Sequence, residues 1–351
     1  MGSGVHAPGL KLYSPQLPLR NGVSASVVVL PYSTIKSQFS SGEAPSLLQF
    51  LQQKFEHVSP AEWLERVQAG LVLAQTGGPN APVLPITVQT PCSPGLRVYY
   101  YRHVAQEPSE TPQAPQVGIL HQDADLLVAD KPHGLPVTPS GHYVQRSLLV
   151  QLKLQTGLQD LAPIHRIDKD TAGLVLFSVL PATRGAYHAL FHDRAVRKTY
   201  QAIAPWCAEL QHPTERHSRI VPAAHFMQMM EVDGTPNSHT HIRMLERLPQ
   251  PPTGFPAHSL AHNQTQGLAL YELQPVSGKR HQLRVHMNAL GAPILNDGIY
   301  PTLRPEGAND PALPLQLLAK RVGFVDPVTG VVREFESLQN LGSGDRNRTG
   351  T

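Results

Sequence analysis

The chain has 351 residues, of which 40% are hydrophobic and 16% are charged. This length and composition exclude a wholly disordered protein and allow one large domain or two ordinary ones. The formal net charge of +3 and the isoelectric point near 8.8 suit a nucleic-acid partner without identifying one.

Neither the cysteines nor the apolar runs point to a secreted or membrane protein. Cys92 and Cys207 have no Cys-x-x-Cys spacing and cannot build a disulfide framework. The N-terminus lacks a basic start followed by an apolar core, and no apolar run approaches the roughly 20 residues that cross a bilayer. We therefore expect a cytoplasmic protein that has no membrane association.

The first hundred residues predict an arm followed by a small module. Residues 1–45 are rich in Ser, Pro and Gly and predict a loosely held N-terminal arm, in which an apolar run at 27–30 can form a strand. Residues 46–104 hold two helix starts, at Ser46 and at Ser59, and strands are expected at 71–74 and 97–102. This small N-terminal α/β module resembles an S4-type RNA-binding module. A packing appendage that does not bind RNA is the alternative interpretation.

A polar, proline-rich linker is expected at 105–116, before a larger region at 117–341 in which strands and helices alternate. Its expected helices are 147–155, 183–193 and 279–290. Its expected strands are 126–129, 173–179, 198–204, 271–276, 315–319, 323–325 and 331–335, together with a hairpin that joins 226–231 to 238–245 through Asp233-Gly234. This pattern predicts an α+β fold with a mixed, largely antiparallel sheet. A loop insertion is expected at 249–265 and a disordered tail at 342–351.

The segment His165-Arg166-Ile167-Asp168 opens a charged loop that runs into the apolar strand expected at 173–179. Loops that are fed by rigid strands often carry reactive groups. A solvated loop whose charges pair locally has the same composition. The segment alone therefore does not identify an active site.

Two later segments add residues that suit RNA chemistry. Lys198 and Tyr200 share one face of a predicted strand, where a tyrosine ring can stack on a base, although a half-buried structural tyrosine is the alternative. If residues 279–290 are helical, His281 and Arg284 are neighbours, and the N–H groups at Ser277-Gly278 can hold a phosphate. A basic surface helix is the alternative for this segment.

Together and in this order, these segments resemble the RluA-type pseudouridine synthases. That family carries His-Arg-Leu-Asp-x-x-Thr-Ser-Gly-Leu, Lys-x-Tyr and Gly-Arg-Thr-His-Gln-(Ile/Leu)-Arg-Val-His, which match residues 165–174, 198–200 and 278–286. A strand that ends in Asn/Asp-Lys-Pro-x-Gly appears at 130–134, and the stretch 290–297 also fits. The departures from the family pattern are Ile167, Ala172, Lys279-Arg280 and the lack of a histidine before Ala319.

The resemblance implies the fold of that family and an isomerase that detaches uracil from ribose and reattaches it through carbon 5. It assigns catalysis to Asp168, acting as nucleophile or base, to Arg284 as its ionic partner, and to Tyr200 beneath a flipped base. No cofactor is implied. The substrate-binding residues that it implies are Arg166, His165, Thr171, Lys198, Lys279, Arg280, His281, Gln282 and Lys131. Candidate phosphate contacts are Arg184, Arg194, Arg197, Lys198, Lys279 and Arg280.

The implied partner is ribosomal or transfer RNA, and we expect a monomer without an obligatory protein partner. One alternative is a non-catalytic RNA-binding protein or RNA chaperone on the same fold. The 18 histidines suggest a metal hydrolase as a further alternative. Its best local pair, His239 and His241, shares a strand face with Arg243, and no His-Glu-x-x-His motif supports it, so no metal site is predicted.

Overall fold

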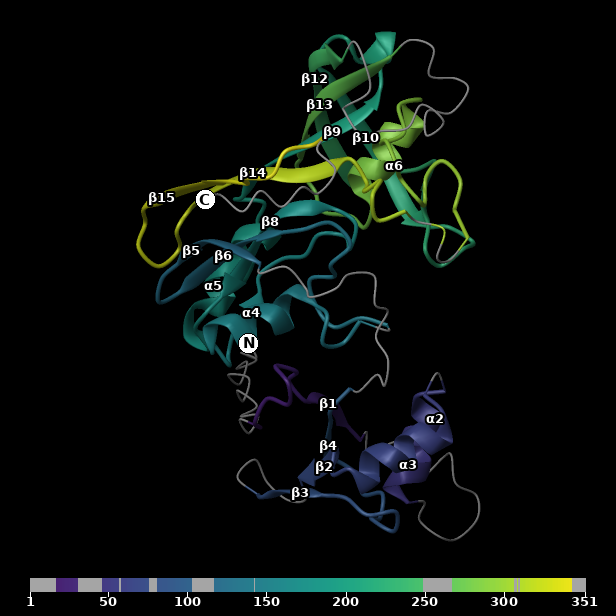
Figure 1. Ribbon diagram of the computed structural model, residues 1–351, viewed down its shortest axis with the longest axis vertical. Coiled ribbons are helices and arrows are strands. Elements are labelled where there is room, and N and C mark those ends of the chain that lie inside the picture. Colours follow the sequence, from purple (N-terminus) through teal and green to yellow (C-terminus); the bar gives the residue numbers. More distant parts are fainter. Residues whose placement is uncertain are drawn as a thin grey trace, which may run out of the picture. The chain divides into compact units, whose positions relative to one another are not determined.

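The computed structural model describes residues 17–30, 46–56, 58–75, 81–102, 117–141, 143–248, 267–305, 308 and 310–342. The chain divides into two compact units, Met1–Glu107 and Pro108–Thr351, each of which is described by itself (Figure 1). The predicted linker, the predicted insertion at 249–265 and nearly all of the predicted tail lie outside the described residues. None of the helices in the described segments is long and apolar enough to cross a membrane.

The first unit is a four-stranded antiparallel sheet with two helices. Its strand order is β1-β4-β2-β3, and its elements are β1 (Ser26–Val29), α2 (Leu47–Lys54), α3 (Pro60–Gln68), β2 (Val72–Gln75), β3 (Val83–Pro85) and β4 (Arg97–Tyr100). Ser46 and Gln49 exchange both bonds of a capping box, and the Ser59 side chain caps α3. β1 pairs with β4, so the apolar run of the predicted arm is a strand of this sheet.

An aromatic cluster fills the core of this unit. Trp63 is fully buried, and its ring centroid lies 5.6 Å from that of Phe55 and 5.5 Å from that of Tyr100. Leu64 of α3 is exposed, so the apolar side chains that this helix buries are Trp63 and Val67.

The second unit is built on an eleven-stranded sheet. The main strand order is β11-β10-β12-β13-β9-β14-β8-β6-β5, with β15 paired to β14 and β7 paired to β8. Among the described strands, every pairing is antiparallel except that of β14 with β8. The elements are β5 (Gly118–Gln122), β6 (Leu126–Lys131), α4 (Leu148–Thr156), β7 (Ala162–Pro163), β8 (Ala172–Ser178), α5 (Pro181–His192), β9 (Arg197–Pro205), η1 (Ala208–Leu210), β10 (Thr214–Pro222), β11 (Met229–Val232), β12 (Ser238–Leu248), β13 (Leu268–Pro275), α6 (Gln282–Ala289), β14 (Leu317–Val325) and β15 (Val332–Glu336). The predicted α+β class with a mixed, largely antiparallel sheet is confirmed.

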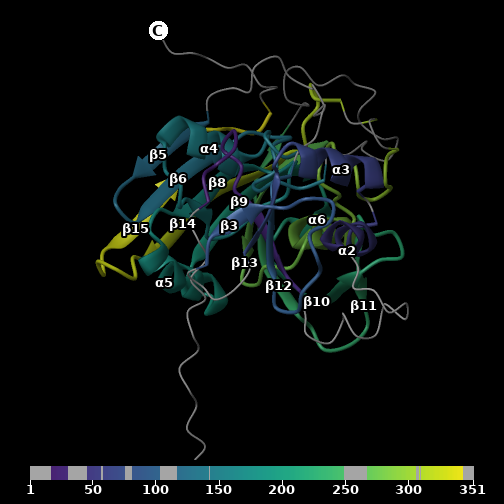
Figure 2. The same cartoon turned by 90° about the horizontal axis from the view of Figure 1, so that it is seen from below.

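Helices cover both faces of the sheet at β6 and β8, which explains why these strands are apolar throughout. Figure 2 shows α4 and α5 on opposite sides of these strands. Alternate side chains of a strand point to opposite faces. The strand residues that pack with α4 are Leu127, Ala129, Val175 and Phe177. Those that pack with α5 are Leu126, Val128, Leu174 and Leu176.

The parallel pairing of β14 with β8 joins the two halves of the sheet. Ala319 of β14 lies opposite Gly173 on one side and opposite Tyr200 of β9 on the other. Gly173 has a φ of +105°, and a Cβ atom there would lie 2.3 Å from the carbonyl oxygen of Ala319. Only glycine satisfies both conditions, so this close approach fixes where the loop before β8 enters the sheet.

Two strand predictions are corrected by the topology. The predicted pairing of 226–231 with 238–245 was wrong, because β10 lies between β11 and β12 and pairs with both of them. Asp233-Gly234 lies in the connection from β11 to β12, and these two strands are not neighbours in the sheet. The strands predicted at 315–319 and 323–325 belong to one strand, β14, which begins at Leu317 and has an irregularity between Ala319 and Arg321.

Candidate active site

A cavity of about 580 Å³ in the second unit gathers the three motifs. Its walls come from the loop before β8, from β9, and from the segment between β13 and α6. The predicted site residues that line it are His165, Arg166, Asp168, Thr171, Lys198, Tyr200, Lys279, His281, Gln282 and Arg284. The tertiary fold therefore brings together side chains that are separated by more than a hundred positions in the chain.

Arg284 lies between two carboxylates at the cavity floor. Its Nη1 atom donates to Oδ2 of Asp168 over 3.2 Å, as the predicted ion pair requires. Its Nε and Nη2 atoms donate to the two oxygens of Asp297 over 2.7 Å and 2.6 Å. The side chains of Arg284 and Asp297 are 2% and 0% exposed, whereas that of Asp168 is 29% exposed. Asp168 is thus the carboxylate that faces the cavity.

The sequence analysis did not assign a role to Asp297, although it noted the stretch that ends there. Besides the guanidinium, Oδ1 of Asp297 accepts the backbone N–H groups of Ile299 over 2.8 Å and Tyr300 over 3.1 Å. A carboxylate that is held this way is a rigid support for a buried arginine. The sequence signal that could have identified Asp297 is its position as the acidic residue of the stretch 290–297, which matches the family pattern.

His281 forms a second contact near Asp168. Its Nε2 atom is 3.9 Å from Oδ2 of Asp168, and its Nδ1 atom is 3.1 Å from the hydroxyl of Tyr300. Burial, partly offset by the charge of Asp168, lowers the pKa of His281 to about 4. The imidazole is therefore neutral near pH 7, and Arg284 is the cation that pairs with Asp168.

Tyr200 is half-buried and lines the cavity. Burial, and next the negative charge of Asp168, raise the pKa of its hydroxyl. The hydroxyl therefore keeps its proton at neutral pH. This favours stacking and hydrogen bonding by Tyr200 over a role as a general base.

His165 lines the cavity but its Nε2 atom is committed to the sheet. That atom accepts the backbone N–H of Leu176 over 3.1 Å, and the ring stacks on Phe191 with a centroid distance of 4.6 Å. Burial, and next the charge of Lys198, lower the pKa of His165 to about 3. The geometry makes His165 an anchor of the loop rather than the substrate contact that was predicted. Thr171 is similarly buried, and its N–H closes a turn onto the carbonyl of Asp168.

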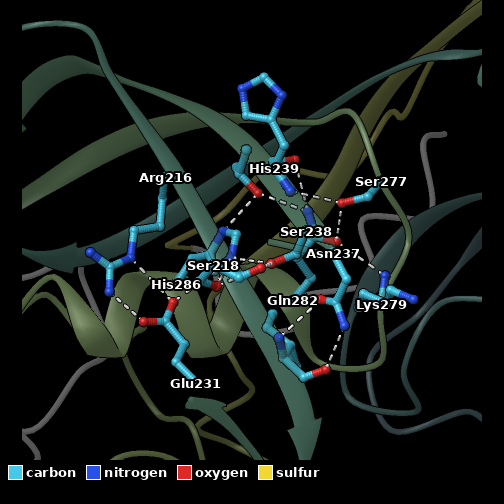
Figure 3. Close-up of polar contacts among 12 residues, drawn as sticks. Arg216, Ser218, Glu231, Asn237, Ser238, His239, Ser277, Lys279, Gln282 and His286 are labelled. Atoms are coloured by element: carbon cyan, nitrogen blue, oxygen red, sulfur yellow. Dashed lines mark hydrogen bonds and ion pairs between the residues drawn. The ribbon is translucent and has the colours of Figure 1, made fainter. Parts of the chain in front are cut away.

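Gln282 has no remaining hydrogen-bonding capacity for a substrate. Its oxygen accepts from the Ser277 hydroxyl and from the Lys279 N–H, over 2.7 Å and 3.0 Å. Its amide nitrogen donates to the carbonyl of His239 and to the Thr240 hydroxyl, each over 2.9 Å (Figure 3). An amide side chain has two donors and two acceptor positions, and all are used here. Instead of the predicted substrate contact, Gln282 makes internal hydrogen bonds that join the segment before α6 to β12.

The same segment corrects the predicted phosphate site at a helix start. α6 begins at Gln282 rather than at residue 279, and His281 before it has a φ of +55°. Gln282 to Met287 are all buried, so α6 is not the surface helix that was the alternative. Ser277-Gly278 therefore precedes the helix by several residues and offers no N-terminal phosphate site.

Two predicted substrate residues do not line the cavity. Lys131 is fully buried, and its ammonium donates to the carbonyls of Pro132 and Lys169 over 2.9 Å and 2.8 Å. Burial lowers the pKa of Lys131 to about 7, against the opposing effect of Asp170 and Asp168. Lys131 thus holds the loop that carries Asp168 through its bond to Lys169. Arg280 is exposed and donates to the carbonyls of Phe226 and Met227.

Some of the candidate phosphate contacts are also occupied within the protein. Arg184 donates to the carbonyl of Asp160, and Arg197 forms an ion pair with Glu334. Neither residue lines the cavity. Besides Arg284, its cationic lining comes from Arg166, Arg194, Lys198 and Lys279. The basic surface nearest to Asp168 is therefore smaller than the sequence predicted.

Comparison with known proteins identifies the family of this chain. The family model described as RNA pseudouridylate synthase matches residues 125–289. The dual-specificity RNA pseudouridine synthase RluA of Escherichia coli is 30% identical over 229 residues, which cover 64% of this chain and 94% of that protein. The chain belongs to the RluA-type RNA pseudouridine synthases. It is therefore an isomerase that converts uridine to pseudouridine.

Other relatives of this pseudouridine synthase support the assignment. An uncharacterized RNA pseudouridine synthase of Synechocystis sp. is 29% identical over 259 residues, which cover 72% of this chain and 79% of that protein. The solved structure titled Human RNA Pseudouridylate Synthase Domain Containing 1 superimposes with a TM-score of 0.52 at 20% identity. It covers 65% of this chain and 86% of that chain, and at this identity it supports the fold alone.

Proposed function

We propose that this synthase isomerises a specific uridine of ribosomal or transfer RNA, with Asp168 as its catalytic carboxylate. The observation that carries the proposal is the unequal exposure of the two carboxylates on Arg284. Asp297 is enclosed and bidentate, whereas Asp168 makes one 3.2 Å contact and faces the cavity. A partly exposed carboxylate that is fixed by a buried cation suits reaction at a sugar carbon.

The chemistry requires a carboxylate at this position. Breaking the bond between nitrogen 1 of uracil and the sugar builds positive character on the sugar, as in glycoside hydrolysis. Asp168 either bonds to the anomeric carbon or removes a proton from the neighbouring sugar carbon. The detached uracil turns, bonds through carbon 5, and loses the proton of that carbon, so no redox cofactor takes part. The guanidinium of Arg284 stabilises the negative charge of the carboxylate throughout.

The uridine has to leave its stack to reach Asp168, at a cost of about a few kcal/mol. We assign Tyr200 to stacking on the flipped base, because its ring lines the cavity beside Asp168. Arg166 is exposed at the same cavity and is placed to hold the displaced RNA backbone. Arg194 and Lys279 extend this cationic lining, which suits phosphate contacts.

Replacing Asp168 by Asn tests the proposal. Asp168→Asn removes the charge and keeps the shape, so we expect no detectable pseudouridine formation and an RNA affinity within a few fold of wild type. Product is measured in total RNA from a strain that lacks the gene, after incubation with each protein, by digestion to nucleosides and liquid chromatography coupled to mass spectrometry, which separates pseudouridine from its isomer uridine. Asp170→Asn is the matched control in the same loop, and it should retain activity because Asp170 does not line the cavity.

The same assay separates the proposed enzyme from the rival function. Activity that survives in Asp168→Asn would remove Asp168 from the chemistry. Wild-type protein that binds this RNA without forming pseudouridine would favour a non-catalytic RNA-binding protein. Mapping the modified positions in ribosomal and transfer RNA then identifies the uridine.

A further inference from the structure

We propose that this chain binds one zinc-like divalent transition-metal ion on the exposed face of β10 and β12, through Glu215, His217 and His239. The site is separate from the active-site cavity, which none of these side chains lines. The inference does not depend on the identity of the RNA substrate. It also departs from the sequence analysis, which predicted no metal site.

The strand register assembles this cluster from two segments of the chain. Antiparallel pairing of β10 with β12 places Glu215 opposite His241 and His217 opposite His239. All four side chains share one sheet face, because residues two apart on a strand point the same way. Neither strand contains more than two of these side chains. The cluster therefore depends on the pairing of β10 with β12.

The opposite face of the same strands is closed by a polar network. His286 of α6 lies within hydrogen-bonding distance of the hydroxyls of Ser218, Ser238 and Thr240, over 3.0, 3.0 and 2.9 Å. Figure 3 shows this network, with the imidazole of His239 directed away from it. The histidine cluster thus faces out while α6 covers the other side. An ion bound there would join β10 to β12 without displacing any core group.

The ligand atoms are already close to a coordination geometry. Oε2 of Glu215 lies 3.1 Å from Nε2 of His217 and 3.2 Å from Nε2 of His239. The three ligand atoms all lie within 4.8 Å of one another. A tetrahedral zinc ion with bonds of about 2.0–2.1 Å separates its ligand atoms by about 3.3–3.4 Å. Small side-chain rotations are therefore enough to place one ion between them.

The chemistry of the side chains also suits this ion. A carboxylate and two imidazoles form a common zinc donor set.

His241 completes the arrangement as a supporting residue. Its Nδ1 atom is 3.1 Å from Oε1 of Glu215, the oxygen that does not face the other two histidines. Second-sphere hydrogen bonds of this kind orient a carboxylate ligand. The side chains of Glu215 and His217 are 54% and 50% exposed, which leaves room for water at a fourth position.

A simple surface ion pair explains less of this geometry. One exposed carboxylate gains little from a single histidine partner and needs no more than one. Here two imidazole nitrogens converge on one oxygen, and the rings of His217 and His239 stack with centroids 3.8 Å apart. Within the described part of the chain, this is the one group of three or more His, Cys, Asp or Glu side chains with convergent ligand atoms.

Calorimetric titration of the untagged, chelator-treated full chain with zinc chloride tests the proposal. We expect one equivalent to bind in wild type and binding to be lost in Glu215→Gln, His217→Gln and His239→Gln. His241→Gln should weaken binding by about 10- to 100-fold, as expected for a supporting residue. His188→Gln and His212→Gln, which replace exposed histidines outside the cluster, should bind like wild type.

Cobalt(II) substitution gives a second readout that does not rely on the variants. Wild type should show the intense visible absorption of four-coordinate cobalt, and the His217→Gln spectrum should lack it. Circular dichroism checks that each variant keeps its fold, which the exposure of these side chains predicts. The proposal is overturned if wild type takes up less than half an equivalent of zinc, or if the ligand variants bind as tightly as the controls.

Discussion

At the scale of single residues, the main finding is that Arg284 serves two carboxylates with different tasks. Asp297 satisfies two guanidinium nitrogens and two backbone N–H groups, so it fixes the position of the arginine. Asp168 receives a single bond from the same guanidinium and retains exposed surface. Around one cation, the supporting carboxylate, Asp297, is thereby distinct from Asp168, the carboxylate that we propose to react.

Removing the charge of Asp297 should therefore damage both stability and activity. For Asp297→Asn we expect a loss of about 3–5 kcal/mol in the free energy of unfolding, because a buried arginine loses its bidentate partner. Asp168→Asn is the comparison and should cost about 1 kcal/mol or less, since its carboxylate is partly exposed and Arg284 keeps Asp297. Urea unfolding of the two variants measures the difference. Equal losses would contradict this division of tasks.

At the scale of elements, the junction of β8 with β14 positions the loop that carries Asp168. Gly173 follows the loop that carries Asp168, and it packs directly against Ala319, which in turn pairs with Tyr200. Three segments of the site are therefore tied to one crossing point of the sheet. The absence of a side chain at residue 173 permits this crossing.

Gly173→Ala should accordingly be far more damaging than an ordinary glycine substitution. The new Cβ atom would lie 2.3 Å from a carbonyl oxygen in a backbone conformation that disfavours L-residues, and we expect a loss of about 3 kcal/mol or more. Gly157→Ala is the matched control, because Gly157 has a φ of +73° but no atom within 4 Å of the added Cβ. That control should lose only about 1–2 kcal/mol. Thermal or urea unfolding decides whether the two substitutions differ.

At the scale of the whole molecule, buried neutral histidines should make the protein sensitive to acid. Burial is the largest cause that lowers the pKa of His165 to about 3, and of His281 and His286 to about 4, from the ordinary value of 6.5. The unfolded chain therefore takes up more protons than the folded chain between about pH 6.5 and 4. Stability should be complete above pH 6.5 and should be lost progressively as the pH falls through this range.

Urea midpoints at pH 7.5, 6.5 and 5.5 test this expectation above the range in which most carboxylates titrate. The midpoint should fall from pH 6.5 to 5.5, and His286→Gln should flatten the dependence. His188→Gln, at an exposed position on α5, should leave the slope unchanged. A wild-type midpoint that is constant over this range would contradict the assignment of neutral buried histidines.

The two compact units leave one prediction of the sequence analysis open. Residues 46–102 do form two helices on a small sheet, joined by β1 from the predicted arm. That architecture agrees with a small N-terminal α/β module, but its resemblance to an S4-type RNA-binding module stays a prediction. An RNA partner follows from the family, whose model matches residues 125–289 of the second unit.

The amino-acid sequence alone was enough to recognise the family. Local order was also enough for the helix starts at Ser46 and Ser59, for the buried strand at β8 and for the motif around Asp168, because these signals lie within a few residues of one another. It also placed the candidates Asp168, Tyr200 and Arg284, which line one cavity. These predictions did not require knowledge of how the strands pair.

Which side chains are available to a substrate became clear from the three-dimensional fold. His165, Gln282 and Lys131 look like ligand-binding residues in the sequence, yet their polar atoms are bound to the backbone or to buried neighbours. Each of them has at least one partner that lies 11, 38 or 43 residues away, beyond the reach of a local pattern. For the same reason, the sequence pattern singled out His239 and His241 as a pair of possible metal ligands but not Glu215 and His217. The pairing of β10 with β12 is what brings these two residues next to that pair. Hydrogen bonds between distant strands depend on register, and register is set by the packing of the whole sheet.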